Sequence, residues 1–287
     1  MFRFSHAQRV LFPLLAFTAP ALAGSAACSW SDTVDHVTVP TPDAGGPAAV
    51  ARFVLASGAT TAPDYLDVPF PTDAYLSNGR VAVPGIAKYA VTDNGGGAAF
   101  LTHDLSVLNG FSRTAMAVFS IDDPVTGKPA DIIAPASLPA TETACVADGS
   151  SVFLIDLEAT DASKARVTCR AQYHSNGAGG SRAVVGVGPA RGIVLEEGHK
   201  YAAVLTSRVK VAAGGQLGPS ADFDRVRKGD RTGAIATLYG GAYDKANTAL
   251  QSALASDGAQ IVALAPFTTN AMTSELYALR DAIYAPT

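Results

Sequence analysis

The chain has 287 residues, of which 48% are hydrophobic and 16% are charged, and this composition excludes an intrinsically disordered polymer. The 27 glycines and 17 prolines predict many turns between short elements. The formal net charge of −4 excludes a strongly basic surface, so we expect no nucleic-acid partner.

Residues 1–27 have the three parts of a secretory signal peptide. Arg3 and Arg9 make the start positive, and an apolar run and a cluster of small residues follow. The apolar run is too short to span a bilayer as a mature helix. We therefore expect export. Two cleavage positions stay open, one before Gly24 and one before Cys28.

The segment Ser25-Ala26-Ala27-Cys28 resembles the lipobox of bacterial lipoproteins. In an oxidising compartment Cys145 and Cys169 can pair, which leaves Cys28 as the odd cysteine and available for a diacylglycerol. Residues 28–49 are polar, rich in turn formers and without hydrophobic periodicity, which is typical of a flexible tether. We expect an outer-membrane or cell-surface lipoprotein anchored in the outer membrane through Cys28. A periplasmic or secreted protein is the alternative.

Short apolar stretches separated by turn residues follow the tether. They predict strands at residues 80–83, 114–121, 151–157, 165–173, 182–187, 201–206 and 209–212. The dipeptides Asn176-Gly177 and Gly179-Gly180 are typical of a hairpin turn between two of these strands. Short strands at this spacing predict a mainly β fold arranged as a sandwich.

Two later segments have helical periodicity. Residues 243–256 place alanine and leucine on one helical face, and a second apolar repeat at Met272, Leu276, Leu279 and Ile283 predicts a C-terminal helix. Between them, residues 261–269 predict a further strand.

Three stretches resemble bacterial Ig-like domains of surface-layer and adhesin proteins: MAVFSIDDPVTGKPAD at 116–131, GIVLEEGHKYAAVLTSRVKVAAGGQL at 192–217, and Phe267-Thr268-Thr269. The resemblance implies an Ig-like β-sandwich interrupted by a helical insertion. Together with the export segment, it gives the expected organisation: signal peptide 1–27, tether 28–49, N-terminal β or irregular region 50–111, Ig-like β-sandwich 112–269 with an insertion at about 218–260, and C-terminal helix 270–287.

A broader resemblance rests on two short motifs, Asp67-Val68-Pro69-Phe70-Pro71-Thr72-Asp73 and Leu108-Asn109-Gly110-Phe111-Ser112. They look like motifs in the N-terminal region of bacterial virulence factor lipases, although Asn109 stands where an aspartate is more familiar. In that family a separate α/β-hydrolase domain follows. Two functions are therefore open. One is a non-catalytic Ig-like module of an envelope protein, used for spacing, docking or contact with a ligand that the sequence does not identify. The other is the N-terminal region of an extracellular lipase or esterase, with catalysis supplied by a C-terminal hydrolase domain.

The chain contains no Gly-x-Ser-x-Gly nucleophile elbow. The nearest approach, Gly110 to Thr114, lacks the second glycine, so Ser112 is predicted to be a hydroxyl at the start of a strand. The glycines of 186–192 have the spacing G-x-G-x-x-x-G, and a proline and an expected strand follow instead of a phosphate-binding helix. We predict no catalytic residue and no cofactor in this chain.

Candidate metal ligands are scattered. His36, His103, His174 and His199 lack metal-ligand spacing, and the one close acid–histidine pair, His103-Asp104, is expected to point to opposite faces of a strand. The carboxylates of Asp64, Asp67 and Asp73 could offer oxygens to calcium, but beside prolines they are typical of turns. We predict no metal site.

Cys145 and Cys169 are predicted to form a disulfide, which would stabilise the fold by roughly 3–4 kcal/mol by closing the loop between them. The alternative is two reduced, buried thiols.

Overall fold

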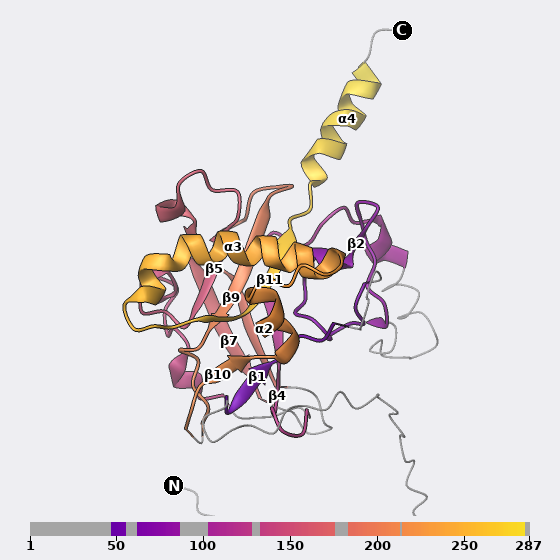
Figure 1. Ribbon diagram of the computed structural model, residues 1–287. Coiled ribbons are helices and arrows are strands. Elements are labelled where there is room, and N and C mark those ends of the chain that lie inside the picture. Colours follow the sequence, from indigo (N-terminus) through magenta and orange to yellow (C-terminus); the bar gives the residue numbers. More distant parts are fainter. Residues whose placement is uncertain are drawn as a thin grey trace, which may run out of the picture. The chain divides into compact units, whose positions relative to one another are not determined.

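A five-stranded and a four-stranded sheet form the centre of the fold (Figure 1). The computed structural model describes residues 47–55, 62–86, 103–127, 133–175, 183–212 and 214–284, without the side chains of residues 274 and 275. The expected signal peptide, the tether up to residue 46, Cys28 and the expected hairpin turn at 176–180 lie outside these residues. All described residues belong to one compact unit, Thr38–Thr287.

Adjacent named strands pair antiparallel, except β1 and β10, which pair in parallel. The five-stranded sheet has the spatial order β10 (Leu217–Pro219), β1 (Ala49–Ala51), β4 (Ala117–Asp122), β8 (Val184–Pro189), β7 (Cys169–His174). The four-stranded sheet has the order β11 (Ile261–Thr268), β9 (Lys200–Thr206), β5 (Val152–Asp156), β6 (Arg166–Val167). A small hairpin joins β2 (Leu76–Ser77) to β3 (Arg80–Val81). The described part of the fold is thus mainly sheet, and its strands do not close into a barrel.

The strands β9 and β11 are buried on both faces. Every residue of β9 after Lys200 and every residue of β11 before Thr268 is buried, which explains why both read as continuous apolar runs. The long helix α3 (Ala234–Ala255) contacts both strands on one side, and β8, β10 and β1 of the other sheet contact them as well. Pro266 lies in β11 at the edge of its sheet, where a residue without an N–H is tolerated.

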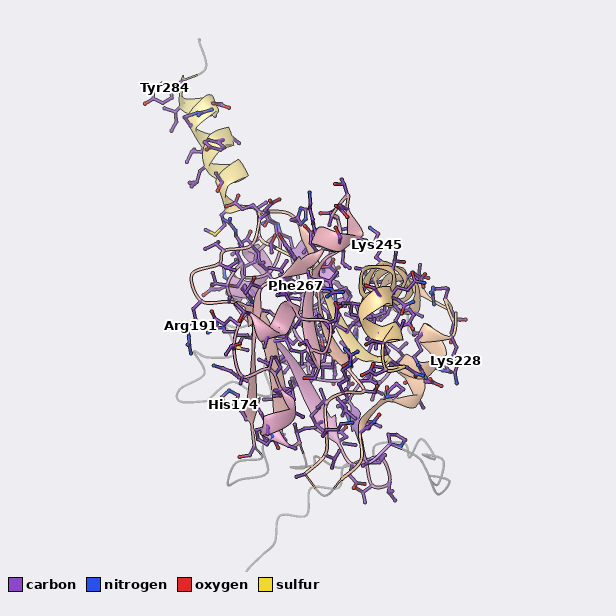
Figure 2. All side chains as sticks on the ribbon, turned by 90° about the vertical axis from the view of Figure 1, so that its left-hand side faces the viewer. His174, Arg191, Lys228, Lys245, Phe267 and Tyr284 are labelled. Atoms are coloured by element: carbon purple, nitrogen blue, oxygen red, sulfur yellow. A yellow bond between two sulfur atoms is a disulfide. The ribbon has the colours of Figure 1, made fainter. Side chains whose placement is uncertain are left out.

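Two helices cover this sheet (Figure 1). In α2 (Ala221–Arg227) the Ser220 side chain accepts a hydrogen bond from the Phe223 N–H, with aspartates in the first turn and arginines in the last. In α3 the residues recurring at three- and four-residue spacing are buried: Ile235, Tyr239, Ala242, Ala246, Leu250 and Ala253. Figure 2 shows Phe267 of β11 in the interior, with Lys228 and Lys245 on the helical side and His174 and Arg191 on the opposite side.

Five short 3-10 helices lie in the described connections: η1 (Asp73–Tyr75), η4 (Leu105–Val107), η5 (Pro135–Ser137), η6 (Ala144–Val146) and η7 (Ala162–Lys164). The last helix, α4 (Met272–Tyr284), exposes its large apolar side chains to solvent. No helix of the described residues has the length and apolar character needed to cross a bilayer.

Several expected elements differ in extent. The strand expected at 165–173 is two strands, because β6 pairs with β5 and β7 pairs with β8 of the other sheet, with the break at Thr168. Residues 209–212 make only isolated bridges instead of a strand, and the strand expected at 193–195 is irregular. The helix expected from residue 243 begins at Ala234. A glycine pair obscured this start. A Cβ at Gly240 would lie 2.1 Å from the Arg231 guanidinium, so that flexible side chain would have to move if another residue stood there.

Candidate functional site

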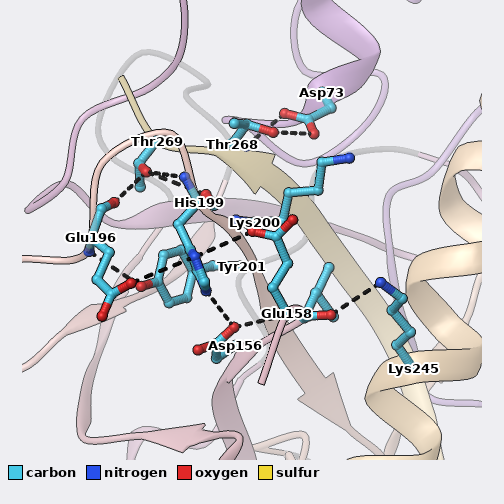
Figure 3. Close-up of polar contacts among 11 residues, drawn as sticks. Asp73, Asp156, Glu158, Glu196, His199, Lys200, Tyr201, Lys245, Thr268 and Thr269 are labelled. Carbon is cyan, nitrogen blue, oxygen red and sulfur yellow. Dashed lines mark hydrogen bonds and ion pairs between the residues drawn. The ribbon is translucent and has the colours of Figure 1, made fainter. Parts of the chain in front are cut away.

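Polar and charged side chains gather where β5 ends and β9 begins (Figure 3). Asp156 is the last residue of β5, and it pairs in register with Tyr201 near the start of β9. This pairing brings His199, directly before β9, to the carboxylates around it. We call His199 and the three carboxylates of Asp156, Glu158 and Glu196 the His199 cluster.

Both ring nitrogens of His199 face carboxylates. Nε2 lies 2.7 Å from Oδ1 of Asp156, and Nδ1 lies 3.2 Å from Oε2 of Glu158 and 3.6 Å from Oε2 of Glu196. The His199 side chain is 20% exposed. Each ring nitrogen that carries an N–H can donate it to the carboxylate that it faces.

The hydroxyl groups beside the ring are engaged by the backbone. Thr269 Oγ1 donates to the Glu196 carbonyl at 2.5 Å and accepts from the His199 N–H at 3.0 Å. The Tyr201 hydroxyl accepts from the Glu196 N–H at 3.2 Å, and burial raises the pKa of this tyrosine. The turn before β9 is therefore fastened to the end of β11.

This geometry does not suit acid–base catalysis. A histidine that activates a nucleophile uses one nitrogen for the hydroxyl and the other for an orienting acid. In His199 both nitrogens are directed at acids, and the nearby Thr269 hydroxyl is held by the backbone instead of the ring. The arrangement is that of a polar contact that holds the end of β5 to the start of β9.

Ser112 makes local hydrogen bonds, and it lies five residues before β4 instead of at the predicted start of a strand. Its Oγ accepts from the N–H groups of Thr114 (3.3 Å) and Ala115 (3.2 Å), two residues before β4 begins. The serine is exposed, and these bonds form a turn that leads into the strand.

The expectation that His103 and Asp104 point apart is wrong. Asp104 has helical backbone angles (φ −75°, ψ −29°) at the start of η4, so the two side chains meet, with Nδ1 3.0 Å from Oδ1. The His103 side chain is 81% exposed. The hydroxyl of the neighbouring Ser106 donates to the His103 carbonyl instead of the ring. Nothing in this arrangement shields a reacting group from water.

The three aspartates considered for calcium have separate roles. Asp67 pairs with Arg52 at 2.7 Å, and Asp73 accepts hydrogen bonds from Thr268. The Asp64 carboxyl group lies against Gly85. Within the described residues, no group of three or more histidine, cysteine, aspartate or glutamate side chains is arranged to hold a metal ion.

The structure confirms the predicted disulfide between Cys145 and Cys169, whose Cα atoms are 5.5 Å apart. Cys169 begins β7, and Cys145 lies in η6, which contacts both β5 and β7. The bond therefore ties a connecting segment to the edge strand of the five-stranded sheet. Gly186 and Gly188 lie within β8, and a turn at Arg191-Gly192 follows this strand, so they do not begin a phosphate-binding helix.

No direct signal in the sequence indicated the His199 cluster, because Asp156 and His199 are 43 residues apart. A weak signal existed. Asp156 lies near the end of one apolar run and His199 directly before another, and antiparallel pairing of those runs places the two side by side.

Comparisons with protein-family models, with curated proteins and with solved structures found no match. The resemblances to Ig-like domains and to the N-terminal region of bacterial lipases therefore rest on the residues quoted for them.

Proposed function

We propose that this chain is a non-catalytic Ig-like module of an exported, lipid-anchored bacterial envelope protein, used for spacing, docking or ligand contact. One observation supports the absence of catalysis in this proposal: both ring nitrogens of His199 face carboxylates. The His199 cluster is the most buried contact between a histidine and acids in the described residues, and its contacts join strands.

The sheet arrangement supports an Ig-like sandwich. Two sheets of mostly antiparallel strands lie in contact, with β5 and β9 against β8 and with β10 and β1 against β11. Their inner residues belong to one hydrophobic core, to which α3 also contributes. Aligned sheets over a shared core are the basis of the Ig-like architecture.

The disulfide supports export. Disulfides persist in oxidising compartments such as the periplasm and the cell surface, and they are rare in the bacterial cytosol. The Cys145–Cys169 bond therefore agrees with the signal-like segment that carries Arg3 and Arg9. With these two cysteines paired, Cys28 is the one cysteine left for a lipid.

Metabolic labelling tests the anchor. In a Gram-negative host grown with radioactive palmitate, the full chain is expected to incorporate label into the membrane fraction. The Cys28→Ala variant is expected to incorporate none while still reaching the periplasm. Equal labelling of both proteins would contradict lipidation at Cys28.

Covalent probing tests the absence of an activated serine. A fluorophosphonate reacts with serines whose hydroxyl is activated by a nearby base. We expect no labelling of the native chain above that of the heat-unfolded protein. Labelling of the native chain that Ser112→Ala abolishes would contradict the proposal.

The exposed apolar side chains of α4 favour a second candidate function. Six large side chains of this helix are more than half exposed: Met272, Leu276, Tyr277, Leu279, Ile283 and Tyr284. Exposed apolar surface of this kind marks a contact with another protein surface. A following hydrolase domain would supply that surface if the chain is the N-terminal region of an extracellular lipase or esterase. A Gly-x-Ser-x-Gly motif in frame after Thr287 would support this function, and a stop codon there would contradict it.

A further inference from the structure

A small pocket of about 220 Å³ lies where β8 ends, on the side of the molecule opposite α3. Arg170, Arg191 and Thr114 line it together with the turn residue Gly192 and the apolar residues Pro189, Ala190, Ile193 and Val194. None of these described lining residues is acidic. Two guanidinium groups therefore face a partly apolar hollow without a carboxylate in it.

The two arginines differ from the other arginines of the described residues. Each of the others donates a guanidinium hydrogen bond to a carboxylate, a side-chain amide or a backbone carbonyl. Within the same ranges, the guanidinium groups of Arg170 and Arg191 have no such acceptor. The Nε atom of Arg170 is buried and lacks a hydrogen-bond partner. A buried donor without an acceptor is unfavourable. Because this Nε atom is closed to solvent, an oxyanion in the pocket would bind the terminal nitrogens of the Arg170 guanidinium instead.

Backbone geometry brings the two side chains to one place. Arg170 lies on the edge strand β7 in register with Gly188, and Arg191 lies in the turn after β8. Gly192 has φ 84°, a left-handed value suited to the third position of a type II turn, and the Ile193 N–H closes this turn on the Ala190 carbonyl. Figure 2 shows Arg191 at the periphery on this side of the molecule.

The nearest acid named by a contact is bound to the backbone of Arg191 and not to its guanidinium group. The carboxylate of Glu142 accepts the backbone N–H of Arg191 at 3.0 Å, and Glu142 does not line the pocket. The two guanidinium groups thus present two positive charges that are unpaired within the described residues.

We propose that this pocket binds the phosphoryl group of a phosphate monoester, with Arg170 and Arg191 as its ligands and Thr114 as an additional hydroxyl donor. A guanidinium group offers a planar fork of N–H donors that matches phosphate oxygens. A phosphate monoester carries close to two negative charges at neutral pH, which matches the two arginines better than the single charge of a carboxylate. The pocket has more room than a phosphoryl group needs, so part of the attached group would lie in it against the apolar residues.

Titration of the full chain with inorganic phosphate, followed by NMR or calorimetry, tests the site. We expect saturable binding that Arg191→Gln and Arg170→Gln each weaken about tenfold or more. The matched control is Arg225→Gln, which removes the same charge from an exposed position on α2. Arg191 is exposed, so its variant is expected to keep the wild-type melting temperature.

Acetate tests the ligand class, and we expect it to bind at least about tenfold more weakly than phosphate, because it offers only one charge. Absence of saturable phosphate binding, equal loss in Arg225→Gln, or equal binding of acetate would each overturn the proposal. Two further probes identify the source of the phosphoryl group. Binding of glycerol phosphate alone supports a soluble ligand, and sedimentation with phosphatidic acid vesicles that requires both arginines supports a lipid headgroup.

Discussion

Asp73 accepts hydrogen bonds from both polar donors of Thr268, a residue 195 positions later in the chain. The Thr268 N–H lies 2.6 Å from Oδ1 of Asp73, and the Thr268 hydroxyl lies 2.7 Å from Oδ2. Asp73 closes the motif that begins at Asp67, and Thr268 is the last residue of β11. This motif therefore ties the N-terminal region to the final strand.

The second motif reaches the same place. Oδ1 of Asn109 accepts from the Ala271 N–H at 3.0 Å, and a Cβ on Gly110 would lie 2.6 Å from the backbone of Thr269. The Phe111 N–H donates to the Thr268 carbonyl at 2.8 Å. The two motifs that carry the resemblance to lipase N-terminal regions thus have a structural role at the end of β11.

The Asp73→Asn variant removes the charge of this side chain but keeps an oxygen that can accept a hydrogen bond from Thr268. Burial raises the pKa of Asp73, with hydrogen bonds from Thr268 acting in the opposite direction. The raised folded-state pKa means that folding disfavours the ionised form of Asp73. The contribution of this group to stability is therefore full below the pKa of an unfolded aspartate, about 3.9, and it falls as the pH rises through the folded-state pKa. Asp73→Asn is expected to be at least as stable as the native protein at pH 7, with the difference shrinking in acid.

The control for this prediction is Asp73→Ala, which leaves the Thr268 donors without an acceptor and is expected to cost about 1–3 kcal/mol. Urea midpoints at several pH values provide the measurement. Equal destabilisation by the asparagine and alanine variants at pH 7 would show that the charge of Asp73, attracted by Lys200, dominates instead.

The pair of Arg208 and Asp257 predicts a loss of stability in strong acid. Hydrogen bonding from Arg208 lowers the pKa of Asp257 to about 2. The stabilisation by this pair is therefore complete above pH about 4, where an unfolded aspartate is ionised, and is lost as pH falls toward 2. Asp257→Asn is expected to reduce stability at pH 7 and to show no difference from the native protein below pH 2. A pH-independent difference between the two urea midpoints would contradict this assignment.

Removal of Arg208 itself is expected to cost more than removal of Asp257. Its guanidinium also donates to the carbonyls of Ser150 and Ala253, which joins the start of β5 to the end of α3. We expect Arg208→Ala to lower the free energy of unfolding by about 2 kcal/mol or more. A double-mutant cycle with Asp257→Asn measures the coupling, and additive effects would contradict a direct interaction.

Removal of His199 tests its role as a fastening between strands. His199→Ala leaves three carboxylates facing each other without the ring, and we expect a loss of about 1.5–3 kcal/mol. The matched control is His103→Ala, whose highly exposed ring pairs with the adjacent Asp104, and a change within about 0.5 kcal/mol is expected there. Equal losses in the two variants, measured by urea unfolding, would contradict the structural role of the His199 cluster.

The disulfide contributes to stability by restricting the unfolded chain. We expect Cys145→Ser with Cys169→Ser to lower the free energy of unfolding by about 3 kcal/mol, given a sequence separation of 24. Non-reducing peptide mapping of periplasmic material is expected to recover the linked pair. Cys28→Ser serves as the control and is expected to leave the unfolding midpoint unchanged. Free thiols at both positions in that material would contradict the bond.

The strands of the core could be predicted from the sequence because apolar runs such as those of β5, β9 and β11 are set by burial itself. Which strands pair with each other could not be predicted in the same way. The break at Thr168, which sends β6 and β7 to different sheets, has no local signal because both halves have the same strand character. The start of α3 was missed because Gly240 and Gly241 have low helix propensity, which the packing of the helix against β9 and β11 outweighs.

The candidate site was harder to predict than the fold. The disulfide followed from cysteine parity, but the His199 cluster depends on the register of β5 against β9, and register is a tertiary property. The pair His103-Asp104 was misjudged because a strand was assumed where the chain turns into η4. The pocket at Arg170 and Arg191 joins residues of separate elements, so neither arginine is distinctive in the sequence.

Turnover of p-nitrophenyl esters by the purified mature chain tests the central claim most directly. Acyl transfer needs an activated nucleophile, a base within reach and an oxyanion hole. Both His199 nitrogens face carboxylates, and the Ser112 hydroxyl accepts backbone N–H groups. We predict a rate that is the same for the native chain and for its Ser112→Ala and His199→Ala variants and that does not saturate with substrate. A saturable rate that either variant abolishes while remaining folded would contradict a non-catalytic module.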